Sequence, residues 1–338
     1  MSDTFCPMPF VHLNIKQGGR VCACWRHTAD LGNHTTETLT SIFNNDSMKT
    51  LRHELMNDIK SEGCHSCWDM EKSGVTSTRQ KAIVNWPKIT YDNLKDAQAT
   101  NYTVDTFLLK SIEVRFDNAC NLMCRHCSPQ YSTKWETAVK KEVGLYDELH
   151  KYNMVKDITK SAISLTDDVI SEVEKFAQHL EEILITGGEP LYHEKHYAFL
   201  EKILPWAQNI TLNYNSNLSV LKYKNKSIIP LWKKFKKVSV LVSIDATRDT
   251  YEYVRVHGNI SRVEKNILEL KNNLDNIYLQ ATCTTSLLNI TKFVDIMKYF
   301  LTLQVGVHTS LVQYPESLNI KLLPIELKKN SNAGLGTV

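Results

Sequence analysis

The sequence predicts an α/β fold in which a parallel sheet follows a small cysteine-rich N-terminal segment. From about residue 104 onward, short runs rich in β-branched residues alternate with helical patterns, and more than half of the nine cysteines precede that point. Strands separated by helices form parallel sheets, because the chain crosses back over the sheet between them. We therefore expect an open sheet or a barrel, with functional groups at the carboxyl ends of its strands.

Six strand-like runs and two helical stripes define this predicted sheet. The strand-like runs occupy residues 112–116, 183–186, 210–214, 238–244, 277–282 and 307–312. Apolar residues between them recur at helical spacing, as in Val169, Val173, Phe176 and Leu180 and again in Val263, Ile267, Leu270 and Leu274. We expect the sheet domain to span residues 104–318, with the cysteine-rich module over 1–103 and a C-terminal tail over 319–338.

Length and composition are those of an ordinary globular chain. The 338 residues are 42% hydrophobic and 23% charged, with a formal net charge of +3. So small a charge gives no reason to expect a nucleic-acid partner. The N-terminus lacks the basic and apolar regions of a signal peptide, and no run approaches the roughly 18 apolar residues of a membrane span. We expect a cytoplasmic protein with neither a membrane nor a nucleic acid as partner.

Three cysteines stand together directly after the first predicted strand. Cys120, Cys124 and Cys127 have the spacing CxxxCxxC behind the run "SIEVRF". A structural zinc site is closed by four protein ligands, whereas three thiolates can hold three irons of a 4Fe-4S cluster and leave the fourth iron open. In a reducing compartment such groups are more typical of metal ligands than of disulfides. A zinc site closed by a distant residue such as Cys283 stays open as the alternative.

The motif "ITGGEP" follows one strand later, and with it the chain resembles the radical SAM superfamily. Family members use a glycine-rich turn there to bind the amino group of S-adenosylmethionine, and glycine lets the backbone approach a ligand closely. The resemblance spans about residues 110–315. It implies a partial (β/α)6 TIM-like barrel in which the CxxxCxxC loop holds a 4Fe-4S cluster that binds S-adenosylmethionine. The turn residues that it assigns to this cofactor are Gly187, Gly188, Glu189 and Pro190.

Polar residues at later strand ends match further positions of the family. "NYNSN" ends the third predicted strand and "SIDA" the fourth, similar to family positions around the ribose and carboxylate of S-adenosylmethionine. "YEYVRVHG" holds an arginine where many relatives have one near the methionine carboxylate, a pairing that suits a planar guanidinium. The resemblance therefore implies cofactor contacts for Asn215, Asn217, Ser243, Asp245 and Arg255. Each residue also suits an ordinary turn or cap.

The resemblance also implies a reaction. In members of the superfamily, the 4Fe-4S cluster delivers one electron to S-adenosylmethionine. Cleavage of this cofactor yields a 5'-deoxyadenosyl radical that abstracts hydrogen from the substrate. The electron has to come from an external donor such as a flavodoxin or a ferredoxin. The substrate, a peptide or a small molecule, is left open, because no set of residues at the strand ends identifies a catalytic acid or base.

A second cysteine set lies ahead of the predicted barrel. Cys6, Gly19 and Cys24 fit a Cx12Gx4C pattern, and Cys64 and Cys67 add a CxxC. Four thiolates can enclose a second 4Fe-4S cluster and leave it no open iron. The pattern resembles the twitch or SPASM auxiliary modules of radical SAM enzymes, although those modules usually follow the barrel. Cys22 could replace Cys24 as a ligand.

Other interpretations stay open. Four cysteines suit zinc as well as a cluster, so the N-terminal set is also compatible with a zinc knot. The main alternative is a zinc-binding interaction protein with two cysteine sites, contacting RNA through the lysine-rich segment 222–238. Another is a radical SAM fold that binds its cofactor but serves only as a partner or carrier. An auxiliary cluster, by analogy, favours net oxidation of the substrate.

Overall fold

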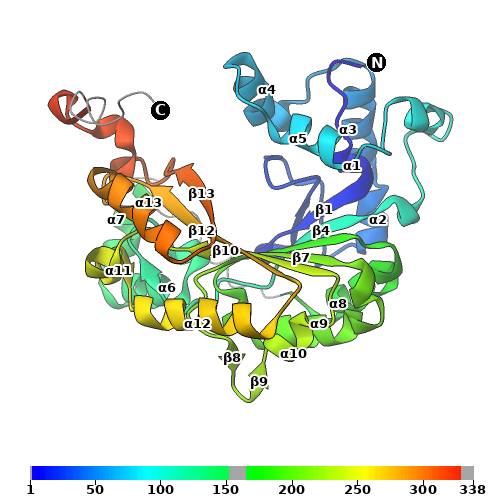
Figure 1. Ribbon diagram of the computed structural model, residues 1–338. Coiled ribbons are helices and arrows are strands. Elements are labelled where there is room, and N and C mark those ends of the chain that lie inside the picture. The colour runs from blue at the N-terminus through cyan, green and yellow to red at the C-terminus, as the bar shows by residue number, and fades with distance from the viewer. Residues whose placement is uncertain (1, 152–164, 329–338) are drawn as a thin grey trace.

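A single curved sheet of nine strands forms the centre of the molecule (Figure 1). The computed structural model describes residues 2–151 and 165–328. The strands follow the order β13-β12-β10-β7-β6-β4-β1-β2-β3. Their bounds are β1 His12–Ile15, β2 Arg20–Cys22, β3 Gly32–Asn33, β4 Ser111–Arg115, β6 Glu182–Thr186, β7 Thr211–Ser216, β10 Lys237–Ser243, β12 Ile277–Thr285 and β13 Gly306–Leu311.

The seven strands from β13 to β1 pair in parallel, whereas β2 and β3 are antiparallel additions at one edge. All six strands predicted from the sequence are present, with ends that move by three residues at most. They form the partial barrel, so the predicted α/β class and architecture are confirmed. Two short ribbons lie outside the sheet: β5 (Met123–Cys124) with β11 (Arg255–Val256), and β8 (Lys222–Tyr223) with β9 (Lys226–Ser227).

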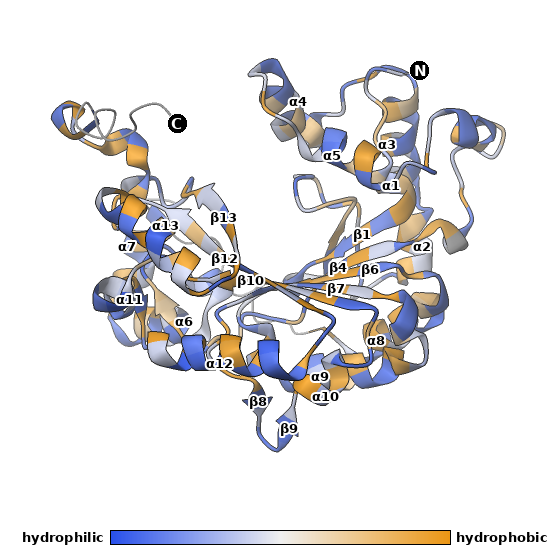
Figure 2. Cartoon of the chain, viewed as in Figure 1, coloured by the Kyte–Doolittle hydropathy of each residue, from blue (hydrophilic) through white to orange (hydrophobic). Residues whose placement is uncertain are grey.

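Helices cover the outer face of the curved sheet and leave its inner face open (Figure 1). The alternating burial along strand β10 reflects this arrangement. Val238, Val240 and Val242 are fully buried against the helices, while the residues that alternate with them face inward and are more exposed. Figure 2 shows hydrophobic residues gathered in the strands and on the sheet-facing sides of the helices. The helices that follow β4 are α6 Thr133–Lys141, α7 Leu145–Lys151, α8 Asp167–Phe176, α9 Glu194–Ile203, α10 Ile229–Trp232, α11 Arg248–Val254, α12 Ile260–Asn273 and α13 Phe293–Thr302.

The cysteine-rich N-terminal region is joined to the barrel through the sheet itself. Strand β1 pairs in parallel with β4, so that His12 lies opposite Ser111 and Ile15 opposite Val114. One apolar core runs from this region through the barrel. The helices of the region are α1 Met8–Val11, α2 Leu39–Phe43, α3 Asp46–Met56, α4 His65–Lys72 and α5 Thr78–Asn85. None of the helices among the described residues is long and apolar enough to cross a membrane.

A buried arginine ties several segments of the N-terminal region together. Arg52 on α3 is fully buried, and its guanidinium lies 4.7 Å from the ring centroid of Phe43. It donates hydrogen bonds to the backbone oxygens of Pro9, Phe43 and Tyr102, at 2.7 to 3.0 Å, and to the side chain of Asn44. Backbone carbonyl oxygens thus accept the hydrogen bonds that a carboxylate accepts in most buried arginine ion pairs.

Replacing Arg52 with methionine is expected to lower the free energy of unfolding by about 3 kcal/mol or more. The methionine keeps the apolar contacts but leaves several buried carbonyl oxygens unpaired, at about 1–3 kcal/mol each before relaxation. Thermal or denaturant unfolding measures the change. Lys49→Met on the same helix serves as the control, because Lys49 is only partly buried. Equal stability of the two variants would show that the Arg52 hydrogen bonds contribute little.

Candidate functional site

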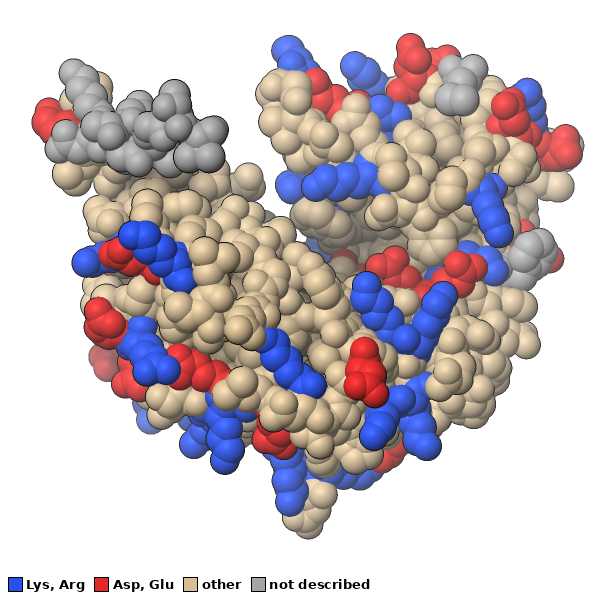
Figure 3. Space-filling model, in the orientation of Figure 1, with Lys and Arg blue, Asp and Glu red and all other residues tan. Residues whose placement is uncertain are grey.

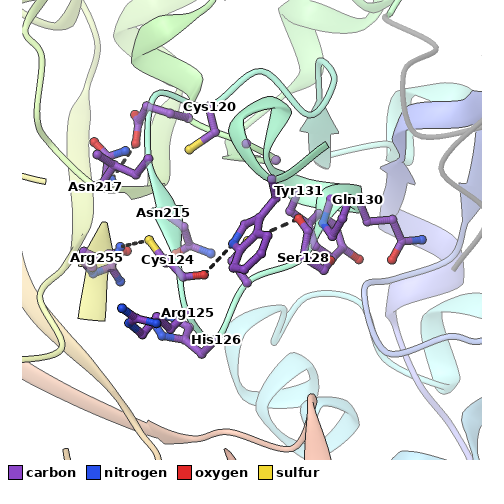
Figure 4. Close-up of a pocket in the computed structure, with 18 of the residues that line it drawn as sticks. Cys120, Cys124, Arg125, His126, Ser128, Gln130, Tyr131, Asn215, Asn217 and Arg255 are labelled. Atoms are coloured by element: carbon purple, nitrogen blue, oxygen red, sulfur yellow. Dashed lines mark hydrogen bonds between the residues drawn. The ribbon is translucent and has the colours of Figure 1, made fainter. Parts of the chain in front are cut away.

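A cavity of about 620 Å³ opens at the carboxyl ends of the barrel strands, within the hollow seen in Figure 3 between the two arms of the molecule. Its walls come from the loop after β4, the turn after β6, and the ends of β7, β10 and β13. Ten residues predicted from the sequence line it: Cys120, Cys124, Cys127, Gly187, Gly188, Glu189, Asn215, Asn217, Ser243 and Arg255. The barrel therefore brings residues of five separate sequence motifs to one cavity (Figure 4).

Hydrogen bonds on two sides hold the cysteine loop. Strand β5 pairs antiparallel with β11. On the other side, the Ser132 hydroxyl caps α6 and donates to the backbone oxygen of Leu122 at 2.6 Å, and the Trp135 indole donates to the oxygen of Cys124 at 2.8 Å. The backbone in the middle of the cysteine loop is thus held from both sides by the protein fold.

The three thiols of the loop have the chemistry of metal ligands. Burial raises the pKa of the Cys120 and Cys124 thiols and raises that of Cys127 to about 12. These thiols are therefore protonated at neutral pH unless a positive centre displaces the proton, as metal coordination does. No fourth cysteine lines this cavity among the described residues. Cys283 is fully buried on β12, near the Asn289 side chain, and does not line the cavity.

The glycine turn after β6 packs directly on the cysteine loop. A Cβ atom on Gly188 would lie 2.2 Å from the backbone oxygen of Ala119, so only glycine fits there. Gly187 has φ +123°, a conformation that favours glycine. The backbone N–H of Glu189 donates to the same Ala119 oxygen at 2.7 Å. The turn thereby forms a cradle, without side chains, beside the three thiols.

If the turn binds S-adenosylmethionine, as the resemblance implies, Gly188→Ala should weaken that binding more than tenfold, because the added methyl group must push the cysteine loop away. Displacements of about 1 Å near reacting groups cost about 100-fold in other enzymes. Equilibrium dialysis with the reconstituted protein measures the affinity. Gly74→Ala is the control: it has φ +75° but open space around its Cβ position, so it costs only about 1–2 kcal/mol of stability. Wild-type affinity in Gly188→Ala would contradict the close packing.

Glu189 acts as a brace between two strand ends. It is 1% exposed, and burial raises the pKa of its carboxyl group. Its oxygens accept hydrogen bonds from the Ser216 hydroxyl at 2.7 Å and from the backbone N–H groups of Leu191 and Asn217. The carboxylate thus locks the end of β7 to the glycine turn.

The remaining predicted residues divide into three groups. Asn215 and Ser243 line the cavity, and their side chains make no hydrogen bond with other described residues, which leaves them available to a ligand. Asn217 donates to the Asn121 side chain at 3.0 Å. Pro190 and Asp245 are buried and do not line the cavity.

Several lining residues are not among those predicted for the site. His126 lies within the cysteine motif, and its Nε2 is 3.3 Å from Asp245 Oδ2. Tyr131 and Trp135 follow the motif, and Tyr314 comes from the loop after β13. The polar start of α6 signals a capped helix beside the loop, but nothing in the sequence places Tyr314 across the barrel from it.

A second, smaller cavity lies in the N-terminal region. Cys6, Cys24, Cys64 and Cys67 all line it. Burial and, next, the neighbouring thiols raise the pKa of Cys64 to about 12 and that of Cys6 above its usual range, while burial raises the pKa of Cys24 to about 11. The four predicted cysteines therefore converge. Cys22 does not line this cavity; its sulfur accepts a hydrogen bond from Lys16 Nζ at 3.2 Å.

An arginine also faces this second cavity. Arg79 forms a two-point ion pair with Glu71, with distances of 2.7 and 2.9 Å, and donates to the Phe5 backbone oxygen at 2.9 Å. Its guanidinium thus lines the same cavity as the four thiols, with Glu71 as its counter-charge. In the part of the chain that the structure describes, no three His, Cys, Asp or Glu side chains group as ligands of a single metal ion.

The fold and its two cysteine cavities define the class of protein. The model of the radical SAM superfamily matches residues 114–298, more than half of the 338 residues, and the chain belongs to this superfamily. The model of an iron-sulfur cluster-binding domain, SPASM, matches residues 6–68. That domain precedes the barrel, as predicted. The predicted cofactors, a 4Fe-4S cluster, S-adenosylmethionine and a second iron-sulfur cluster, are confirmed at the level of these families.

Individual relatives are distant. GTP 3',8-cyclase of Campylobacter lari is 23% identical over 198 residues, 58% of this chain and 54% of that protein. The 7-carboxy-7-deazaguanine synthase of Halobacterium salinarum is 27% identical over 101 residues, 30% of each chain. The chain thus spans about half the length of the first relative and a third of the second.

Solved structures give a similar picture. Streptococcus suis SuiB bound to S-adenosylmethionine is 12% identical with a TM-score of 0.46, covering 85% of this chain and 56% of that one. Native anSMEcpe with bound AdoMet is 15% identical with a TM-score of 0.42, covering 60% and 52%.

Proposed function

We propose that this chain is a radical SAM enzyme whose first cluster is held by Cys120, Cys124 and Cys127. The observation that supports this most is the convergence of three thiols from one loop, two buried and one half-buried, with a side-chain-free glycine turn in one cavity. When bound, the cluster and S-adenosylmethionine supply a 5'-deoxyadenosyl radical that abstracts hydrogen from the substrate.

The residues of the chain bind, orient and shield this cofactor pair. Gly187 and Gly188 leave room for the methionine part of S-adenosylmethionine beside the thiols. Asn215 and Ser243 offer free hydrogen-bonding groups at the ends of β7 and β10. The aromatic side chains of Tyr131 and Trp135 line the same cavity and limit the access of water, which protects a reactive radical.

The second cluster belongs, in this proposal, to the module of residues 1–103, with Cys6, Cys24, Cys64 and Cys67 as ligands. Arg79, held by Glu71, lines the same cavity and can donate hydrogen bonds toward the ligands. Such a cluster suits net oxidation of a substrate by the core of residues 104–318, a hypothesis by analogy. The proposed C-terminal tail spans residues 319–338, of which 329–338 lie outside the described part of the chain.

The proposed partners are a substrate and an external one-electron donor such as a flavodoxin or ferredoxin, in the cytoplasm. The names of the two curated relatives refer to GTP and to a deazaguanine, so a small molecule stands beside a peptide as the substrate class.

Anaerobic reconstitution tests the proposal. About eight irons per chain are expected for two 4Fe-4S clusters, and dithionite with S-adenosylmethionine should then yield 5'-deoxyadenosine. A chain that takes up zinc alone would overturn the enzymatic proposal in favour of an interaction protein. Full iron loading without 5'-deoxyadenosine would favour the role of a partner or carrier.

A further inference from the structure

Arg255 lies directly opposite one cysteine of the first thiol set. The ribbon of β5 and β11 pairs Arg255 with Cys124 in register. The guanidinium Nη1 donates to the Cys124 sulfur at 3.6 Å, as the dashed line in Figure 4 marks. Arg255 is 6% exposed, so little water competes for this hydrogen bond. The ribbon thus delivers a buried cation to one sulfur atom.

Asp245 fixes the other side of the same guanidinium. Its Oδ2 lies 2.5 Å from Arg255 Nη2, and the carboxylate is fully buried. Asp245 is itself held, because Oδ1 accepts a hydrogen bond from the Thr284 backbone N–H at 2.7 Å, and the Asn289 side chain donates to its backbone oxygen at 3.0 Å. The ion pair therefore has a fixed direction, with its positive end toward the sulfur.

This arrangement differs from the role that the resemblance implies for Arg255. An arginine that binds the methionine carboxylate needs two free N–H groups for a two-point contact. Here Nη2 already faces a carboxylate of the chain, Nη1 faces sulfur, and Nε is buried without a hydrogen-bond partner among the described residues. Both Nη atoms therefore already have partners within the chain, which orients the guanidinium before any ligand arrives.

A hydrogen bond from a buried cation to a coordinating sulfur changes the reduction potential of a cluster in a known direction. It draws electron density from the thiolate and stabilises the more negative, reduced cluster, which raises the reduction potential. It also fixes the orientation of the Cys124 side chain. Arg255 donates a hydrogen bond to the sulfur, whereas Asp245 contacts only the other end of the guanidinium, so the carboxylate weakens this effect without reversing it.

We propose that Arg255 is a positioning residue of the first cluster: through the Nη1–H···Sγ bond to Cys124 it raises the reduction potential of the cluster, with Asp245 as its anchor. The inference rests on the proposed function, because it requires Cys124 to be a cluster ligand. It also assigns Asp245 to holding Arg255, away from the bound S-adenosylmethionine.

A redox titration followed by electron paramagnetic resonance, without S-adenosylmethionine, tests this inference on the full-length, reconstituted protein. The relevant signal is the one that changes when S-adenosylmethionine is added to a parallel sample. Arg255→Gln should shift the midpoint potential to more negative values. Arg255→Lys should shift it less, because lysine keeps the positive charge but cannot contact Cys124 and Asp245 through two separate nitrogen atoms. Arg248→Gln on α11 is the matched control, since its exposed guanidinium pairs with Glu264 away from the thiols, and should leave the potential unchanged.

A second variant covers the case in which Arg255→Gln fails to fold. That change leaves Asp245 as a buried, unpaired carboxylate, which is strongly destabilising. The double variant Asp245→Asn with Arg255→Gln removes both charges together. Its potential should still be more negative than that of the wild type, because the bond to sulfur is lost.

Two results would overturn the inference. A wild-type potential in an Arg255 variant that retains its full iron content would show that the N–H···S bond has no redox effect. Weaker binding of S-adenosylmethionine at an unchanged potential would show instead that Arg255 contacts the methionine carboxylate. If the wild-type protein has no cluster signal that responds to S-adenosylmethionine, the proposed function fails and this inference fails with it.

Discussion

Cys124→Ala should lower the rate of 5'-deoxyadenosine formation by more than about 100-fold. Losing an outer-shell partner of a metal site typically costs 10–100-fold, and the loss of a direct ligand costs more. The iron content should also fall, from about eight to about four per chain, because two thiolates cannot retain the open cluster. Anaerobic assays and iron analysis of the reconstituted variant measure both effects.

Cys283→Ala is the matched control for this experiment. Cys283 is also fully buried but lies on β12 and does not line the first cavity. It should behave as a small buried hydrophobic residue, so its replacement should leave iron content and product formation near wild type. Wild-type activity in Cys124→Ala, or loss of activity in Cys283→Ala, would contradict the assignment of the cluster to the CxxxCxxC loop.

Cys24→Ala should remove the second cluster and lower the melting temperature of the protein. The four thiols of this set come from separate segments: Cys6 before α1, Cys24 after β2, and Cys64 and Cys67 at the start of α4. A metal group that joins such segments contributes its binding free energy to folding. The iron content should therefore drop by about four per chain while the first cluster remains. Iron analysis and thermal unfolding measure the two effects.

Cys22→Ala, two positions earlier, separates this effect from the mere loss of a buried thiol. Cys22 is at least as deeply buried as Cys24, but its sulfur lies at Lys16 and outside the second cavity. It should keep the full iron content. If Cys22→Ala lost iron while Cys24→Ala retained it, the ligand assignment would be reversed.

The barrel strands were predictable because each is long enough to show its pattern. Val238, Val240 and Val242 alternate with less buried residues, and the segment is long enough to distinguish from a helix. Strand β1 could not be found in this way. It has four residues, all buried, and its partner β4 lies about a hundred positions farther along the chain. Only tertiary structure makes that segment a strand.

The parts of the site that could be predicted are those whose residues lie close together in the sequence. The cysteine and glycine motifs each sit within one loop, so their residues are neighbours in any fold. Asp245 and Arg255 are a different case: both match family positions at the cofactor, yet they contact each other. Likewise, β2 ends at Cys22, and only the course of the chain beyond it brings Cys24 to the other thiols. Such pairings depend on side-chain direction, which spacing does not specify.

The shared sheet has a consequence for how this architecture can be inherited. Because β1 pairs along the length of β4, removing the N-terminal region would leave the β4 backbone groups unpaired at a bare edge, open to association with other chains. The buried Glu113 would also lose the hydrogen bond that Asn14 donates at 2.8 Å. The N-terminal region therefore cannot be removed without exposing the edge of the barrel sheet. It can be exchanged between proteins only together with a strand that protects the edge of the barrel.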